Sequence, residues 1–68
     1  MLLVDLLRDE YPMVRREAVR ALGELGTARA THALVEVAGH DLSAEVREEA
    51  VAVLGALLRE RRRHGTEG

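Results

Sequence analysis

The chain has 68 residues, a net charge of −2, no cysteine and a single aromatic residue, Tyr11. A chain of this length holds at most one small domain, and without cysteine it has neither disulfide bonds nor thiolate metal ligands. Its 47% apolar and 32% charged residues indicate a globular domain, and with one aromatic residue we expect no platform for stacking nucleic-acid bases.

No stretch of the chain is apolar enough to cross a membrane, which takes about 20 consecutive residues. The N-terminal run Leu2–Leu7 is interrupted by Asp5 and followed by three charged residues at 8–10, which is unlike a secretory signal. We therefore expect a cytoplasmic protein that does not contact membranes.

Residues 1–8 predict a short opening helix, because their leucines fall on one helical face. A second helix is predicted over residues 12–25, since Pro12 suits the first helical position and Gly26 suits a helix end. Its apolar residues recur at helical spacing, at Val14, Ala18, Ala21, Leu22 and Leu25.

Thr27 can cap a third helix over residues 28–38, and a turn is expected at residues 39–42. Ser43 can cap a fourth helix that extends to about Arg63, where arginines suit the negative end of the helix dipole. The apolar stripe of this helix repeats that of the second, at Val46, Ala50, Val53, Leu54 and Leu57. No segment shows the alternation of a β-strand, so we predict an all-α fold.

The two halves of the chain are related by an internal repeat with a period of 32 residues. When residues 9–25 are aligned with 41–57, nine of the 17 positions are identical. Gly23 and Gly55 recur at the same place inside a helix, where glycine is unfavourable. We expect them to allow a close crossing between the two helices of each unit.

The repeat predicts one domain over residues 1–68, an αα-superhelix of two repeats and four helices. We place repeat 1 at residues 1–26 and repeat 2 at residues 27–60, followed by a polar tail at 61–68. Leu58 stands where repeat 1 has Gly26, so we expect the solenoid to stop at this helix.

The repeated residues also carry a family resemblance. They are Asp9, Pro12, Val14, Arg15, Ala18, Ala21, Leu22, Gly23, Leu25 and Gly26, then Asp41, Val46, Arg47, Ala50, Leu54, Gly55 and Leu57. This pattern resembles HEAT-like repeats of the short type found in phycobilisome-lyase-like proteins. Such repeats serve scaffolds, lyase subunits, nucleic-acid enzymes and adaptors alike. We predict a non-catalytic protein-interaction or assembly module, and the resemblance suggests as the alternative a helper or regulatory subunit of an enzyme, such as a bilin-lyase relative.

Two pairs are the strongest polar signals, Asp9 with Arg15 and Asp41 with Arg47. One interpretation makes them an anion-binding or catalytic group. The resemblance implies instead that each turn aspartate and helix arginine belongs to a structural ladder between stacked units, and we expect this second role.

The resemblance also places the outer face of each second helix on the concave surface of the superhelix. The expected partner-binding residues there are Arg16, Arg20, Glu24, Glu45, Glu48 and Ala52. Arg16 aligns with Glu48 in the repeat, so we expect an ion pair between them across the units. A protein or peptide is the partner that this surface suits.

Stacked units bury one flank on the next, and repeat arrays usually need about three units and polar caps. Val19 should pack onto the second unit, whereas its counterpart Val51 has no third unit to meet. We expect an exposed self-association flank formed by Val35, Leu42, Val51 and Leu58. Apolar patches of this kind mark interfaces, so we predict a two-fold homodimer, the commonest closed assembly. The competing interpretation is a domain excised from a longer solenoid, in which these flanks meet further repeats.

We expect no catalytic residues, cofactor or metal. His32 and Glu36 share a helical face, but no third ligand accompanies them, and His40 and His64 suit exposed positions. No glycine-rich phosphate loop precedes a helix. The arginine-rich segment 59–63 leaves weak nucleic-acid binding as a further alternative, which we do not favour, because a short basic segment on an acidic chain neutralises few phosphates.

Overall fold

The structure is a computed structural model that describes residues 2–67, with side chains described for residues 2–63. It contains four helices in chain order: η1 (Leu3–Arg8), α1 (Pro12–Leu25), α2 (Ala28–His40) and α3 (Ala44–Glu67). No strand occurs within residues 2–67, which confirms the all-α, four-helix prediction. Gly68, the last residue of the expected polar tail, and Met1 lie outside the described residues.

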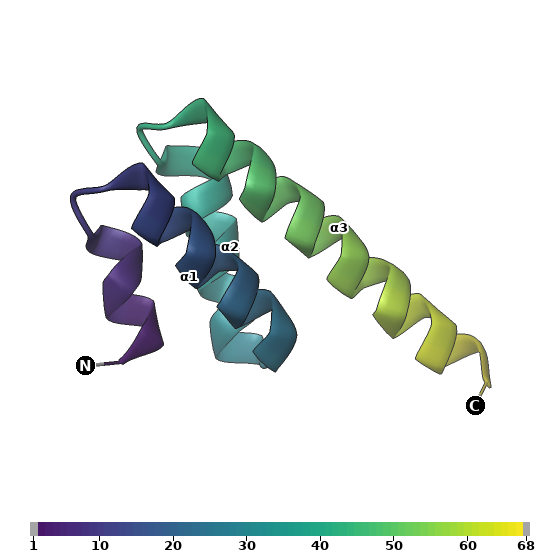
Figure 1. Cartoon of the computed structure of the whole chain (residues 1–68). Helices are drawn as coiled ribbons and strands as arrows, with labels where there is room; N and C mark the ends of the chain where they lie inside the picture. The colour runs from purple at the N-terminus through teal and green to yellow at the C-terminus, as the bar shows by residue number, and fades with distance from the viewer. Residues whose placement is uncertain (1, 68) are drawn as a thin grey trace.

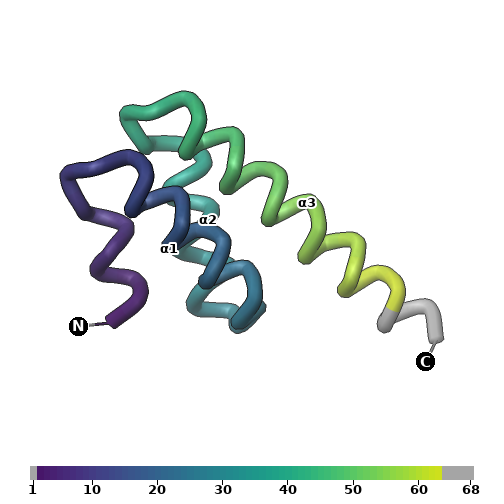
Figure 2. Tube along the Cα trace, viewed as in Figure 1, coloured from purple at the N-terminus to yellow at the C-terminus, as the bar shows by residue number. Residues whose placement is uncertain are grey.

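The four helices form two hairpins that stack side by side (Figure 1). η1 and α2 are the first helices of the two units, and α1 and α3 are the second helices. α3 packs against both α1 and α2, so the second unit contacts the second helix of the first unit. The later turns of α3 extend away from the other helices, as the trace in Figure 2 shows.

The helix ends follow from the local sequence. Pro12 occupies the first position of α1, where its missing N–H leaves no bond unmade. Gly26 ends α1 in the left-handed conformation at φ 62°, and its N–H donates to the carbonyl of Leu22 at 3.1 Å. The hydroxyl of Thr27 then accepts from the N–H of Ala30 at 3.1 Å and caps α2.

Three helices differ from their expected bounds. η1 is a 3-10 helix of six residues, a form that short segments often take. α2 ends at His40, two residues later than expected. α3 continues to Glu67 rather than to about Arg63, and Leu58 explains why it does not turn as α1 does. Leucine avoids the left-handed conformation that Gly26 adopts at the corresponding position.

The core lies where the hairpins meet. Its buried apolar residues come from α1, α2 and α3, and they are Ala18, Val19, Leu22, Ala30, Leu34, Val37, Val46 and Ala50. Leu3 and Leu7 of η1 pack against this cluster from the N-terminal side. Val19 is wholly buried because α3 covers the flank of α1 on which it lies. The core is therefore an interface between units as much as within them.

The close helix crossing expected at the glycines is wrong in one respect. A side chain at Gly23 would collide with Cγ1 of Val53, so the close approach joins α1 to α3, across units rather than within one. A side chain at Gly55 would meet only the Arg59 guanidinium, at an ordinary 3.7 Å. Gly55 is thus the sequence counterpart of Gly23, but it makes no close contact with another helix as Gly23 does with Val53.

We predict opposite effects of adding one methyl group at the two glycines. Gly23→Ala should lower the free energy of unfolding by about 1–3 kcal/mol, because Val53 is stiff and packed against the core. Gly55→Ala should raise it by about 0.5–1 kcal/mol, because alanine favours the helix and the position is open. Thermal unfolding followed by circular dichroism measures both. Equal shifts would contradict the α1–α3 crossing.

Candidate functional site

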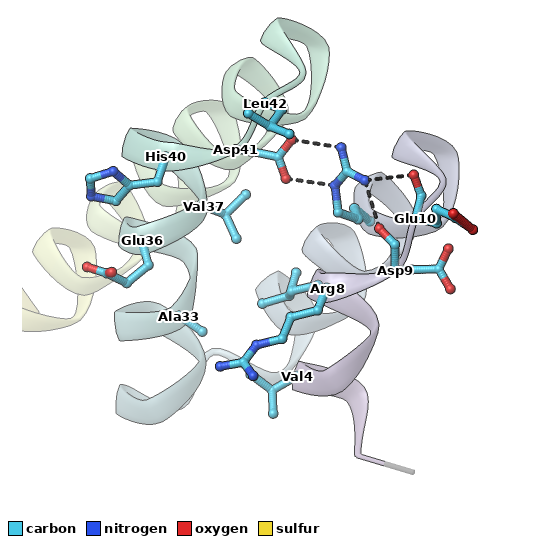
Figure 3. Close-up of a pocket in the computed structure, with 12 residues that line it drawn as sticks. Val4, Arg8, Asp9, Glu10, Ala33, Glu36, Val37, His40, Asp41 and Leu42 are labelled. Atoms are coloured by element: carbon cyan, nitrogen blue, oxygen red, sulfur yellow. Dashed lines mark hydrogen bonds and ion pairs between the residues drawn. The ribbon is translucent and has the colours of Figure 1, made fainter.

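Arg15 and Asp41 form a bidentate ion pair between the two units, which we call the cross-unit clamp. Nε of Arg15 donates to Oδ2 of Asp41 at 2.9 Å, and Nη2 donates to Oδ1 at 3.1 Å. The two side chains are only 12% and 6% exposed. Figure 3 shows the paired fork between the start of α1 and the turn after α2. Two parallel hydrogen bonds give such a pair directionality as well as strength.

Local hydrogen bonds hold both halves of the clamp in place. Nη1 of Arg15 donates to the carbonyl of Asp9 at 2.7 Å, in the turn before its own helix. The carboxylate of Asp41 accepts a second bond at Oδ1, from the N–H of Ser43 at 2.9 Å. Each group is therefore oriented by its own unit before it meets the other.

The same local bonds recur at the outer ends of the molecule. Nη1 of Arg47 donates to the carbonyl of Asp41 at 2.6 Å, as Arg15 does to Asp9. Oδ1 of Asp9 accepts from the N–H of Tyr11 at 2.9 Å, as Asp41 does from Ser43. Among the described side chains, however, Arg47 forms no ion pair with a carboxylate and Asp9 none with a cation. The ladder residues expected from the sequence thus form one complete clamp, Arg15 with Asp41. Arg47 and Asp9 each have the local hydrogen bond of the clamp without the ion pair, and we call them half-clamps.

The clamp changes the acidity of both partners. Partial burial by itself raises the pKa of Asp41, but hydrogen bonds from Arg15 and Ser43 and the charges of Arg15 and Arg47 outweigh it. The pKa of Asp41 therefore lies below its ordinary value of 3.8. The hydrogen bond to Asp41 raises the pKa of Arg15 in turn.

A second ionic contact between the units differs from the one we expected. Glu49, not Glu48, pairs with Arg16: the Nε···Oε1 distance is 3.2 Å, and Nε of Arg20 lies 3.2 Å from Oε2. The alignment of Arg16 with Glu48 identifies equivalent positions, and equivalent positions on parallel helices do not face each other. Glu49 lies one turn before Val53, which faces α1, so its helical phase is the signal that sequence reasoning missed.

The hydrogen bonds from Arg20 and Arg16 lower the pKa of Glu49 below its ordinary value of 4.5. The hydrogen bond to Glu49 also raises the pKa of Arg20. Arg20 makes a further contact within α1, to Glu17 at 3.5 Å. Because these side chains are more exposed than the clamp, we expect them to contribute less to stability.

The remaining concave-face candidates surround these pairs. A hollow of about 230 Å³ is lined by Arg16, Glu45, Glu48, Glu49 and Ala52. Glu24 and Arg20 are exposed on α1 nearby. Glu45 and Glu48 are also exposed and form no ion pair with another described side chain. The hollow therefore suits a polar or basic side chain of a partner.

A larger groove of about 680 Å³ lies between η1 and α2. Val4, Ala33 and Val37 give it apolar walls, with Arg8, Glu36 and His40 among its polar lining (Figure 3). Leu42, 96% exposed, lines this groove. The structure thus places Leu42 beside the first unit and not with the other residues of the expected self-association flank.

The other three flank candidates lie on the side of the second unit that faces away from the first. Val51 and Leu58 are two turns apart on one face of α3, and each is 59% exposed. Val35 is exposed on α2. From here on, the α3 flank means Val35, Val51 and Leu58 together with Arg47.

The described residues contain neither a cluster of metal ligands nor a membrane-spanning helix. No three histidine, aspartate or glutamate side chains among them come together to hold a metal ion. No helix within the part searched is long and apolar enough to cross a membrane.

Comparison with known families decides what kind of repeat this is. Residues 1–55 match the family described as HEAT repeats. The chain belongs to the HEAT repeat family. No curated protein and no solved structure is significantly similar to it. HEAT repeats generally mediate protein–protein interactions and typically form scaffolds without catalytic activity.

We predict that the clamp arginine matters more than its counterpart. Arg15→Ala should lower the free energy of unfolding by about 2–3 kcal/mol, because it leaves the largely buried Asp41 carboxylate without its cation. Arg47→Ala loses a bond to a carbonyl and should cost about 1 kcal/mol. The exposed control Arg62→Ala should stay within about 0.5 kcal/mol. Urea unfolding ranks the three HEAT-repeat variants, and equal effects of Arg15 and Arg47 would contradict the clamp.

We also predict that acid weakens the HEAT domain through its two bridging carboxylates. Because the pKa values of Asp41 and Glu49 are lowered on folding, their contribution is complete above about pH 5. It is lost as the pH falls below the ordinary values of 3.8 and 4.5 and through the lower pKa values of the folded protein. Thermal midpoints measured between neutral and acidic pH should therefore drop less for Asp41→Asn than for the wild type. An unchanged drop would contradict the assignment, and Glu24→Gln serves as the exposed control.

Proposed function

We propose that this HEAT-repeat chain is a non-catalytic protein-interaction and assembly module that associates with itself through the α3 flank. The observation that carries the proposal is the contrast between Val19 and Val51. Val19 is fully buried between the units, whereas Val51, its counterpart 32 residues later, is 59% exposed. The apolar stacking surface is thus buried on the first unit and exposed at the equivalent position on the second.

Neighbouring residues extend this surface. Leu58 lies two turns after Val51 on the same face of α3, and Val35 adds an exposed side chain from α2. A contiguous apolar patch with a polar rim is the usual mark of a protein interface. Arg47 supplies such a rim here, because its guanidinium is oriented by the carbonyl of Asp41.

The concave face supports a second contact, with a peptide or protein partner. Arg20, Glu24 and Glu45 are exposed there, and the hollow beside Glu48 is open to solvent. Mixed charges of this kind give specificity and faster association more than raw affinity. We assign this face to a heterologous partner and the α3 flank to assembly.

Two alternatives have less support. The arginines at 59, 61 and 62 are exposed on α3, but Glu60 lies between the first two, and the chain has a net charge of −2. Binding to nucleic acid scales with the number of phosphates neutralised, so such contacts are weak at physiological salt. A role as helper subunit of an enzyme rests on the family resemblance alone.

We predict that Val51→Glu abolishes self-association without unfolding the chain. Light scattering of the wild type should show species larger than a monomer from low micromolar concentration upward, and the variant should remain monomeric, because a carboxylate cannot be buried on the apolar flank. Leu42→Glu is the matched control, since repeat 1 has Glu10 at that position and Leu42 lines the groove instead. A monomeric wild type would contradict the self-association.

A further inference from the structure

The α3 flank of the second unit corresponds to the surface with which the first unit contacts the second. The opposite flank, on the first unit, corresponds to the surface with which the second unit contacts the first. We infer that one copy stacks head to tail on another, with Arg47 on the α3 flank of the first binding the Asp9 carboxylate of the second. This inference rests on the proposed self-association and specifies its register. It replaces the two-fold arrangement expected from the sequence with a translation by two repeats.

The polar half of the argument comes from the two half-clamps. The completed clamp has an arginine held by its own turn carbonyl and an aspartate held by the N–H two residues later. Arg47 and Asp9 have these same local bonds, at 2.6 and 2.9 Å, and neither has an ionic partner among the described side chains. Both groups are therefore already oriented for the bidentate bond that they lack.

The apolar half comes from the 32-residue correspondence. Within the molecule, α1 buries Val19 against the second unit, which contributes Leu34 and Leu57 to the core and its edge. The counterparts of these two leucines are Leu2 and Leu25 of the first unit, which are 67% and 60% exposed. A second copy can therefore cover Val51 with residues of the same type that cover Val19.

The glycine positions agree with this register. Gly23 admits Val53 of the second unit. At Gly55 only the Arg59 guanidinium lies near the corresponding place, 3.7 Å from where a Cβ would stand, and the counterpart of Val53 is Ala21. The smaller Ala21 of a second copy fits beside Gly55 without a collision.

One contact does not recur, and it sets the strength of the association. Inside the molecule Glu49 bridges Arg16 and Arg20. At the outer flanks the counterpart of Glu49 is Glu17, and the counterparts of the two arginines are Glu48 and Ala52. The stacked copies therefore have one clamp and one unfavourable pair of glutamates, so the contact is weaker than the internal one.

A head-to-tail contact uses different surfaces on the two copies, so it leaves a free flank at each end of the stack. The average mass should accordingly keep rising with concentration, without a plateau at the dimer. A two-fold contact would instead stop at the dimer, because it uses the same flank twice.

Charge exchange between full-length variants tests the register. Asp9→Arg and Arg47→Asp each place like charges at the contact, and each alone should weaken self-association at least about tenfold. An equimolar mixture should recover it, because the arginine introduced in one variant can then meet the aspartate introduced in the other, and the native pair can also form. Circular dichroism verifies that each variant folds. If Asp9→Arg unfolds, Asp9→Asn replaces it, because asparagine keeps the acceptor for the Tyr11 N–H. We expect Asp9→Asn to lose self-association.

A gain of affinity provides an independent test on the exposed face of α3. Ala52→Arg and Glu48→Arg recreate the arginines that bind Glu49 inside the molecule, now opposite Glu17 of the next copy. Each should strengthen self-association by up to about fivefold, the equivalent of about 1 kcal/mol for an exposed pair. Ala56→Arg is the matched control, because it adds the same charge at the counterpart of Glu24, which does not contact the second unit through an ion pair.

The outcomes separate this inference from the proposed function. Full association of Asp9→Arg, sensitive to Val51→Glu and ending at a dimer, would overturn the head-to-tail register and leave self-association standing. A wild-type protein that stays monomeric would overturn the proposed self-association. If the double variant Ala52→Arg, Glu48→Arg also stayed monomeric, the head-to-tail register would be overturned as well. Association of that double variant, lost on adding Asp9→Arg, would support the register.

Discussion

The bidentate bond between Arg15 and Asp41 determines how the two hairpins lie against each other. A carboxylate fork admits a guanidinium in few orientations, and both groups are also tied to their own turns. With this contact in place at the start of α1, Val19 meets the core further along the helix. Gly23 then lies against Val53 one turn later. The clamp near the start of α1, the Glu49 bridge and the close approach at Gly23 together set the register of α1 against the second unit.

This arrangement also explains how so short a chain forms a core. A domain of 68 residues buries a limited part of its surface, so its stability is marginal. The buried core residues here are all alanine, valine or leucine from three helices, and no buried side-chain polar atom among the described residues lacks a hydrogen-bond partner. The largely buried ion pair adds less net stability than its geometry suggests, because desolvation opposes it. Its main effect is to select one stacking register.

The proposed function rests on the same repetition. A unit that stacks on its neighbour must have two complementary flanks, and any array presents one of each at its ends. In this HEAT domain the end flanks keep the apolar residues and the oriented half-clamps of the internal contact, but they lose the second ionic bridge. In the proposed self-association, the kind of surface that joins the two units also joins molecules, in a weaker form.

The sequence by itself determined the helices, the repeat and the family. Pro12, Gly26 and Thr27 act locally on the backbone, and the spacing of apolar residues reports the helical period, so these features need no knowledge of distant contacts. The aspartates and arginines of the ladder could be named from the repeat and the resemblance. Which aspartate pairs with which arginine could not be predicted in this way.

Only the tertiary structure decided the partners across the units. It paired Arg16 with Glu49 and not with Glu48, brought Gly23 against Val53, and placed Leu42 on the groove beside η1. The sequence repeat aligns equivalent positions, but contact between parallel helices depends on their relative rotation and separation. These are set by the packing of side chains that lie 26 to 33 residues apart in the chain, a distance over which local propensity carries no information.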